Sequence, residues 1–303
     1  MTAVLVVGSI HIDRIMRVDR LPAPGETGVA IEAWTQIGGK AANQAIASAM
    51  LVPTALAACV GTDTDGRQAL EVLRREGVER RVRQSRRHVT GSSAALVDAR
   101  GENLAVISPA ANEALAAADV VAAIEELEPT VVVCQWESPL ETVREALATA
   151  RVAGCATLLN AAPWFEGHRP VLPLADHVVV NAVEADAWVG SPLDGIPARA
   201  PFGHHRVIVT IGAEGAGHYR DDHLVLHQPA ARVEALSTHG AGDHFVGALA
   251  GGLARGLPLE ATLREASDAA GKWVRSLRKD VLRIPGLSHP ANPTRSTPEA
   301  ARP

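Results

Sequence analysis

Apolar residues fall into short continuous runs along this chain, and the first of them, residues 3–7, ends at Gly8. A run without polar alternation is typical of a strand that is buried on both faces of a parallel sheet. Similar runs recur and alternate with segments of helical periodicity. We predict strands at residues 55–60, 130–134, 156–160, 177–180 and 207–211, and helices at residues 65–75, 113–127, 139–151 and 259–277, with a short helix from residue 183. This order predicts an α/β fold, with a Rossmann-like, mostly parallel central sheet and helices on both faces.

Two stretches, about residues 12–36 and 92–108, break this rhythm because each holds two imperfectly alternating segments around a turn. We interpret them as strands outside the main sheet that form a small β-sheet lid over a site. The lid belongs to a single predicted domain of residues 1–285. The prolines that follow, among Ser, Thr and Asn, predict a disordered tail at residues 286–303.

The composition limits the partners and the compartment. The 303 residues carry a net charge of −5, which gives no general attraction to nucleic acid or to an anionic membrane surface. No apolar run approaches the length of a membrane span, and the N-terminal run is too short for a signal peptide. Cys59, Cys134 and Cys155 are odd in number and far apart, as expected for buried thiols in a reducing compartment. We therefore expect a cytoplasmic protein that binds neither nucleic acid nor membrane.

A helix with apolar residues spaced by four is predicted after the small residues Gly240, Ala241 and Gly242, with Asp243 in its first turn. The amides at a helix start are unpaired and carry the positive end of the helix dipole, so small residues there let a phosphate approach the backbone. Taken alone, the stretch is more typical of an ordinary helix cap than of an anion site with a base beside it.

A second glycine-rich helix start supplies polar side chains. Gly38 and Gly39 precede Lys40 and Asn43, which lie one helical turn apart and can donate to hydroxyl groups. The spacing of a Walker loop and the Gly-x-Gly-x-x-Gly pattern of dinucleotide-binding proteins are both missing from the sequence. This argues against a P-loop kinase and against an NAD enzyme.

Several predicted strands end in polar residues, and ligands of open α/β sheets gather at the carboxyl ends of strands. These residues are Ser9, His11 and Asp13 after the first strand, then Gln135 and Glu137, Asn160, Asn181 with Glu184, and Thr210 with Gly212. Their repeated placement at one edge favours a ligand site over chance.

Six segments in one order resemble the ribokinase family, also called the PfkB-type carbohydrate kinases. They are Gly8-Ser9-x-x-x-Asp13, Gly38-Gly39-Lys40-x-x-Asn43, Gln135-x-Glu137, Asn181-x-x-Glu184, Thr210-x-Gly212-x-x-Gly215 and Gly240-Ala-Gly-Asp243. The resemblance runs from Val4 to about Lys279. It implies transfer of the γ-phosphate of ATP to a primary hydroxyl of a pentose or pentose-like sugar.

The resemblance also implies roles for individual residues. Asp243 would be the general base in the Gly240-Ala241-Gly242-Asp243 segment, with the amides of Ala241, Gly242 and Asp243 as an anion hole. Asn181 and Glu184 would serve Mg²⁺ and phosphates, through water because Mg²⁺ gives up its hydration reluctantly. The remaining positions divide into a sugar-binding set of His11, Asp13, Gly39, Lys40, Asn43 and Glu137, and a nucleotide-binding set of Thr210, Gly212 and Gly215.

The chain departs from the family at several positions. His11 stands where ribokinases have an asparagine, which predicts an altered sugar preference unless the side chain faces outward or is merely tolerated at this position. Ser237 and Asp280 replace an aspartate and a glycine of K⁺-activated members, so we expect weak or absent K⁺ dependence. His239 and His244 flank the anion hole and are interpreted as structural, because a helix N-terminus disfavours a protonated imidazole.

Two rival functions stay open. A nucleoside kinase of the same fold would need an aromatic platform for the base, and Trp34 and Trp136 are the evident candidates. A sugar-binding regulator without catalysis would have little use for a base beside an anion hole. The lid strands also suggest a homodimer formed through the lid, since exposed strand edges tend to be covered.

Overall fold

The computed structural model describes residues 2–100, 102–231, 240–275 and 282–284. Its main sheet has nine strands in the order β13-β12-β11-β10-β9-β8-β1-β4-β5. All neighbours from β11 to β5 pair in parallel, and β12 and β13 are antiparallel at one edge. The strands are β1 (Val4–Val7), β4 (Thr54–Gly61), β5 (Glu79–Ser85), β8 (Val131–Gln135), β9 (Ala156–Asn160), β10 (His177–Asn181), β11 (Arg206–Ile211), β12 (Gly215–Arg220) and β13 (His223–Gln228). The predicted α/β fold with a mostly parallel sheet is confirmed.

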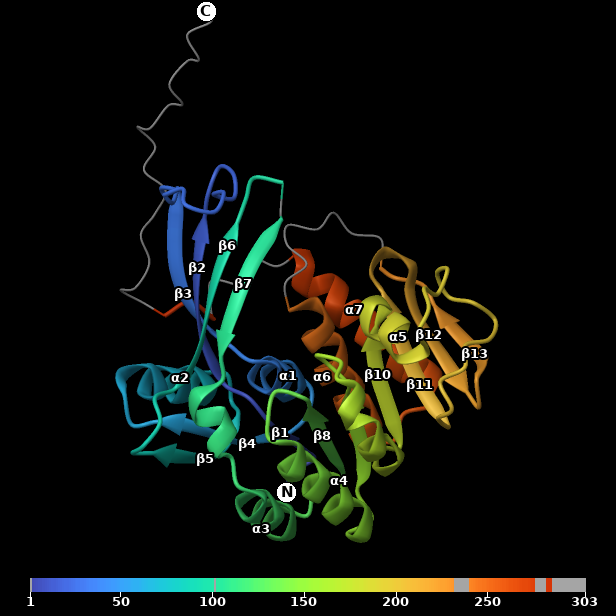
Figure 1. Cartoon of the computed structure of the whole chain (residues 1–303). Helices are drawn as coiled ribbons and strands as arrows, with labels where there is room; N and C mark the ends of the chain where they lie inside the picture. Colours follow the sequence, from blue (N-terminus) through green and yellow to red (C-terminus); the bar gives the residue numbers. More distant parts are fainter. Residues whose placement is uncertain (1, 101, 232–239, 276–281, 285–303) are drawn as a thin grey trace, which may run out of the picture.

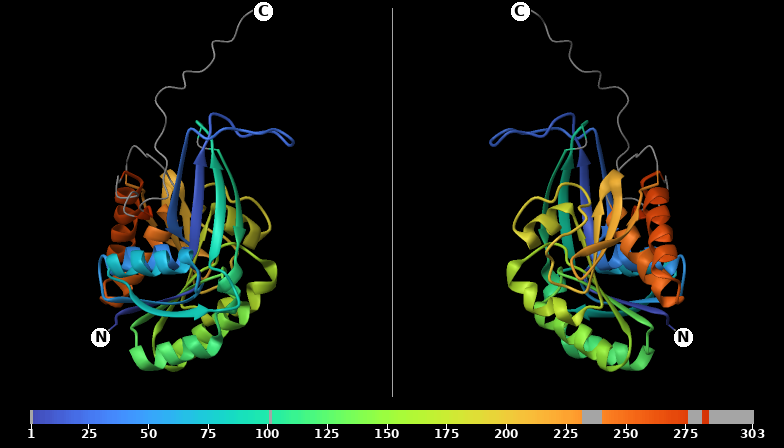
Figure 2. Two further views of the ribbon diagram at one scale, coloured as in Figure 1. Left: turned by 90° about the vertical axis from the view of Figure 1, so that its left-hand side faces the viewer. Right: turned by 90° about the vertical axis from the view of Figure 1, so that its right-hand side faces the viewer.

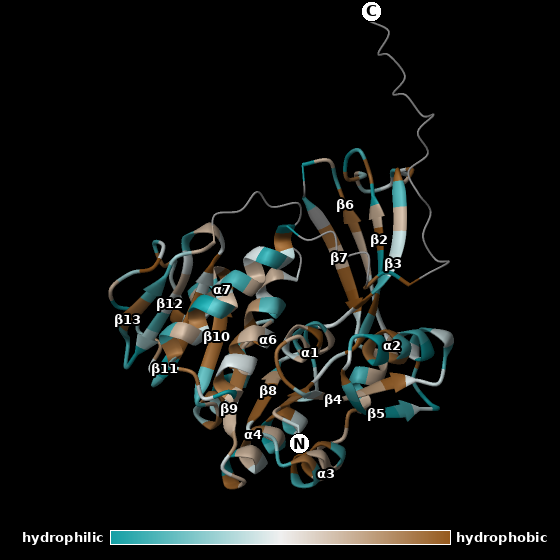
Figure 3. Cartoon of the chain, turned by 180° about the vertical axis from the view of Figure 1, so that it is seen from behind, coloured by the Kyte–Doolittle hydropathy of each residue, from teal (hydrophilic) through white to brown (hydrophobic). Residues whose placement is uncertain are grey.

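Helices cover both faces of this sheet, as the two side views in Figure 2 show. One face carries α1 (Lys40–Ala49), α2 (Thr64–Arg75), α6 (Ala241–Ala254) and α7 (Leu259–Arg275). The other carries α3 (Ala117–Leu127), α4 (Leu140–Val152) and α5 (Ala182–Val189). Each face has its own apolar core, and the inner strands are apolar whereas the helices turn polar residues outward (Figure 3). Among the helices described, none has both the length and the apolar character that crossing a bilayer would require.

Two predicted elements differ in detail. The helix expected at residues 113–127 is a 3₁₀ turn, Ala110–Ala114, followed by α3. The turn is held because the Asn112 side chain accepts from Ile10 N at 2.9 Å and donates to Ile10 O at 2.9 Å. Strand β5 was missed because its arginines interrupt the apolar pattern, which a partly exposed edge strand tolerates. The other 3₁₀ segments are Glu166–Leu174 and Gly212–Glu214.

A second sheet of four strands stands beside the main sheet in the order β3-β2-β6-β7 (Figure 1). Its strands β2 (His11–Arg17), β3 (Glu32–Gly38), β6 (Gly91–Val97) and β7 (Asn103–Ser108) come from the two stretches predicted to form the lid. Strand β2 follows β1 closely, and β3 leads directly into α1. The small sheet is therefore joined to the main one at the carboxyl end of β1.

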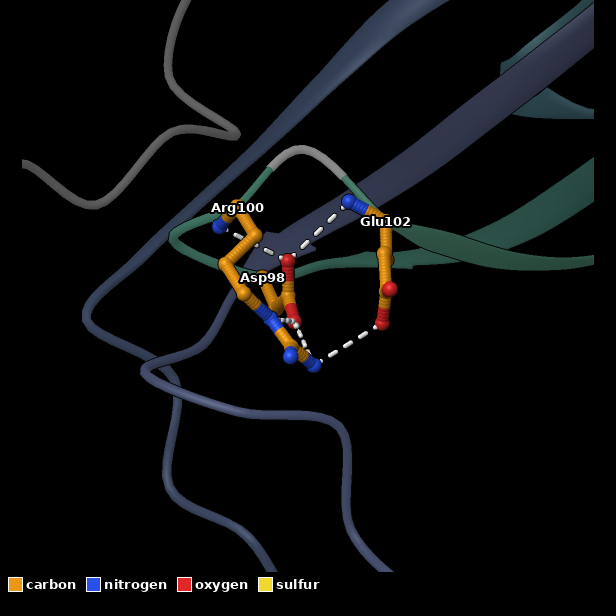
Figure 4. Close-up of polar contacts among 3 residues, drawn as sticks. All are labelled: Asp98, Arg100 and Glu102. Atoms are coloured by element: carbon orange, nitrogen blue, oxygen red, sulfur yellow. Dashed lines mark hydrogen bonds and ion pairs between the residues drawn. The ribbon is translucent and has the colours of Figure 1, made fainter.

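The turn between β6 and β7 is held by side-chain contacts (Figure 4). Asp98 accepts from the backbone N of Arg100 at 2.8 Å and of Glu102 at 3.0 Å. The Arg100 guanidinium contacts Asp98 at 3.3 Å and Glu102 at 2.9 Å. Because Asp98 is buried, these contacts give the tip of the small sheet a defined shape.

Candidate active site

Helix α6 begins where a glycine is needed. Gly240 has φ 77° and caps the helix without a side-chain hydrogen bond, so its left-handed backbone suits glycine alone. A Cβ placed there would lie 3.0 Å from Trp273 Nε1. His244 stacks on the Trp273 ring with centroids 3.7 Å apart, and its Nδ1 lies 3.0 Å from Gly240 O. His244 thus supports the helix start, which agrees with its interpretation as structural.

Asp243 lies in the first turn of α6 and is held by two amides from α1. Asn43 Nδ2 donates to Oδ2 at 3.1 Å, and Gln44 Nε2 donates to Oδ1 at 3.1 Å. Burial raises the pKa of Asp243 above its ordinary value, and the Lys40 charge and the two amides oppose this rise without cancelling it. A carboxylate with a raised pKa is a better proton acceptor than a free aspartate.

Gln44 is a site residue to which the sequence assigned no role. It is fully buried, and its Nε2 also contacts Asn160 Oδ1 at 3.0 Å, while Gln135 Nε2 donates to its Oε1 at 2.7 Å. The chain of amides from β8 and β9 therefore fixes the side chain that holds Asp243. The sequence carries no signal for this role, because the partners of Gln44 lie 91 and 116 residues further along the chain.

Lys40 and Glu137 meet beside Asp243. Lys40 N donates to Glu137 Oε2 at 2.9 Å, and Ser9 Oγ donates to the same oxygen at 2.5 Å. Burial lowers the pKa of Lys40, but the charges of Asp243, Glu137 and Glu184 outweigh it and raise the pKa. The ammonium therefore stays charged near the carboxylate that would act as base.

Asp13 and His11 come from one face of β2, and both are buried. Ser93 Oγ donates to Asp13 Oδ1 at 2.6 Å, and the carboxylate lies over Gly38, where a Cβ would overlap with it. His11 is 3% exposed, and its Nε2 has no hydrogen-bond partner within the described part of the chain. The alternative that His11 faces outward is therefore wrong.

A cavity of about 660 Å³ opens at the N-terminus of α6, on the side of β10 and β11. The predicted residues Asn181, Thr210, Gly212, Gly215, Ala241 and Gly242 line it. The sequence did not single out the rest of its wall, because these residues are small or apolar and carry no motif. They are Ala213, Ala230, Ala231, Phe245, Ser267, Ala270, Gly271 and Val274. The size suits a nucleotide-sized ligand.

Asn181 and Glu184 form a capping box at the start of α5. Glu184 N donates to Asn181 Oδ1 at 2.9 Å, and Asn181 N donates to Glu184 Oε2 at 2.8 Å. Burial raises the pKa of Glu184. No cluster of three His, Cys, Asp or Glu side chains suited to a metal occurs in the described ranges. One carboxylate and one amide oxygen fit an Mg²⁺ that keeps most of its waters.

The predicted residues within the described chain lie in three places: around Asp243 and Lys40, on β2, and along the wall of the cavity. Gly39 has φ 91° at the start of α1, and a Cβ there would lie 2.7 Å from Ser9 O, so it lets the backbones meet closely. Ser237, His239 and Asp280, on which the cation expectation rests, lie outside the described residues. So does the tail predicted at residues 286–303.

A buried carboxylate at a helix start, beside buried polar side chains and a nucleotide-sized cavity, is the arrangement expected of a phosphotransferase. The comparisons agree. Residues 1–278 match the description "pfkB family carbohydrate kinase". Ribokinase of Mus musculus is 34% identical over 289 residues, covering 90% of this chain and 89% of its own. Deoxyribokinase of Salmonella typhi is 33% identical over 274 residues, covering 87% and 89%.

A solved structure gives the same result. Arabidopsis thaliana ribokinase complexed with ribose and ATP superposes with a TM-score of 0.80 at 26% identity, covering 93% of this chain and 98% of its own. The chain therefore belongs to the pfkB family of carbohydrate kinases.

Proposed function

We propose that this protein is an ATP-dependent pentose kinase that transfers the γ-phosphate to a primary hydroxyl of its sugar. The observation that carries the proposal is the place of Asp243. Its carboxylate accepts from the side-chain amides of Asn43 and Gln44 and interacts with the charges of Lys40 and Glu137, while the adjoining Gly242 lines the nucleotide-sized cavity. A base at that junction can reach a hydroxyl that faces a γ-phosphate.

In the proposed reaction Asp243 accepts the proton of the sugar hydroxyl while the hydroxyl oxygen bonds to the γ-phosphorus. The bond from phosphorus to the bridging oxygen breaks, and ADP leaves with that electron pair. The amides at the start of α6 and the Lys40 ammonium stabilise the charge on the transferred group. Glu184 and Asn181 would hold Mg²⁺ through water, and the ion would neutralise phosphate charge.

Sugar choice is proposed to depend on the buried polar set that includes His11. A buried imidazole without a partner costs about 1 to 3 kcal/mol, which a sugar hydroxyl can relieve. Since His11 stands where ribokinases have an asparagine, we propose a shifted sugar preference. A micromolar KM for D-ribose together with preference for it over other pentoses would contradict the shift.

The structure gives little support to a nucleoside kinase. Trp136 is 4% exposed and belongs to the core on the α4 face, so it offers no platform for a base. The Arg283 guanidinium lies 4.8 Å from the centroid of the Trp34 ring and covers one face of it. A purely binding regulator is disfavoured because it would have no need of a buried base.

A panel assay of ADP release across pentoses, hexoses and nucleosides tests the proposal. We expect turnover with at least one pentose and much lower turnover with nucleosides. Turnover confined to nucleosides would establish the rival function, and sugar binding by calorimetry without ADP release would establish the regulator.

We also propose a cytoplasmic homodimer formed through the small sheet. Edge strand β7 exposes Leu104, Val106 and Ile107 by 58%, 70% and 51%, a large apolar surface for an isolated chain. Val106→Lys should shift the mass measured by sedimentation toward the monomer. Exposed Val183 on α5 offers a matched control, Val183→Lys. An unchanged mass in Val106→Lys would refute this interface.

A further inference from the structure

A short segment near the C-terminus, Leu282–Ile284, lies along β3 of the small sheet, where Figure 1 draws it in red. Ile284 N donates to Thr35 O at 2.8 Å, and Arg283 forms an antiparallel bridge with Gln36. Leu282 and Ile284 are each 3% exposed within the core beneath. The segment is therefore anchored on both sides of Arg283; we call it the strap.

The Arg283 side chain fastens the strap to the outer part of β3. Its guanidinium stacks over Trp34 at 4.8 Å from the ring centroid and contacts Glu32 Oε1 at 3.4 Å. Trp34 Nε1 in turn donates to Gln36 Oε1 at 3.0 Å. Side chains two apart on a strand share a face, so these groups line one face of β3.

That face belongs to the sugar side of the site. Gln36 is paired directly with Asp13, and Gly38, two residues further along β3, lies beneath the Asp13 carboxylate. Lys40, the first residue of α1, follows at once. A sideways shift of β3 would therefore displace both Asp13 and Lys40.

We propose that Arg283 is a positioning residue that clamps the strap to β3 and thereby holds the Asp13 carboxylate and Lys40 in place for the sugar. This rests on the proposed kinase function. Without the clamp β3 is free to shift sideways, and the side chains that would bind the sugar lose their alignment.

The test compares Arg283→Ala with Arg283→Lys and with Arg264→Ala, an exposed arginine of α7 paired only with Glu260 among the described residues. We expect Arg283→Ala to raise the sugar KM about 5- to 30-fold with kcat within about twofold. Lysine keeps the charge but loses planar stacking, so it should restore the KM only in part. Arg264→Ala should match the wild type.

The combination of Arg283→Ala with Trp34→Leu should raise the sugar KM little beyond either single change, because both remove one contact.

A lower melting temperature with unchanged sugar KM would show that the strap is merely structural and overturn the inference. An effect of Arg264→Ala equal to that of Arg283→Ala would overturn it as well. If the wild type phosphorylates no sugar, the proposed function fails instead, so the two failures are distinct.

Discussion

The two halves of the proposed site differ in the side chains that line them. On the sugar side the groups that converge are polar side chains, such as Asp13, Lys40 and Glu137, each held by another hydrogen bond or charge. On the nucleotide side the walls are mostly glycine and alanine, as at Gly212, Ala213 and Gly271. A ligand that leaves buried polar groups unpaired binds more weakly, whereas small residues recognise a ligand through the shape of the cavity and through backbone contacts. The choice among sugars should therefore depend on the polar side chains of the sugar side. The size of nucleotide that is accepted should depend on the shape of the cavity.

Asp243 stands where the halves meet, so its replacement should have the largest effect. Asp243→Asn keeps the size of the side chain but removes the proton acceptor, and kcat should fall about 10²- to 10⁴-fold. The ADP-release assay measures this, with the melting temperature as a check on folding. Exposed Asp268 on α7 gives the matched control, Asp268→Asn. Wild-type turnover in Asp243→Asn would remove Asp243 from the mechanism.

The pKa of Asp243 also predicts a direction with pH. Because the pKa is raised above its ordinary value, the carboxylate is lost to protonation at a higher pH than a free aspartate would be. As the pH is lowered, turnover should fall at a higher pH than in an enzyme whose catalytic aspartate has an ordinary pKa.

Much of this arrangement could be predicted from the sequence. Unbroken apolar runs such as residues 131–134 predict the buried strands, since a strand covered on both faces has no polar side. The polar residues at strand ends converge because parallel strands put their carboxyl ends at one edge. A glycine at a predicted helix start, such as Gly240, indicates a backbone conformation that favours glycine, and Gly240 is left-handed with φ 77°.

Other features could not be predicted because they depend on partners far away in the chain. Gln44 acquires its role only when β8 and β9 place Gln135 and Asn160 beside it. The walls of the nucleotide cavity are alanines and glycines whose proximity is a product of packing. The burial of His177 and His218 could not be predicted either, because the sequence does not specify the neighbours of the strands that bury them.

Those two histidines give the next largest prediction, on the nucleotide half of the sheet. Burial lowers the pKa of His177 and of His218 to about 4, against about 6.5 in the unfolded chain. Between these values the unfolded chain binds more protons, so stability is full above about pH 6.5 and is lost as the pH falls toward 4. Each could cost up to about 3 kcal/mol of unfolding free energy.

Urea titrations across this pH range would measure the loss. His177→Gln and His218→Gln should each show a shallower decline than the wild type, while His223→Gln, exposed on β13, should not. A decline of equal slope in all four proteins would place the acid sensitivity elsewhere.

Replacing His11 tests the sugar half and should have a smaller effect. Replacing it with leucine removes the unpartnered imidazole, so the preferred pentose should lose its advantage over the analogue that lacks the matching hydroxyl by about tenfold in kcat/KM. The ATP KM should stay within about twofold, because His11 does not line the nucleotide cavity. If discrimination is unchanged against every deoxy analogue, the imidazole does not contact the sugar.

The smallest effect is expected at Ala270, which faces the nucleotide cavity from α7. Leucine keeps the helix and fills part of the 660 Å³, so the ATP KM should rise about fivefold while the preference among sugars is unchanged. His11→Leu and Ala270→Leu thus form a crossed pair, each affecting one substrate and sparing the other. If Ala270→Leu altered the ranking of sugars, the nucleotide walls would also contribute to specificity. The division between side-chain recognition on one half and shape on the other would then be wrong.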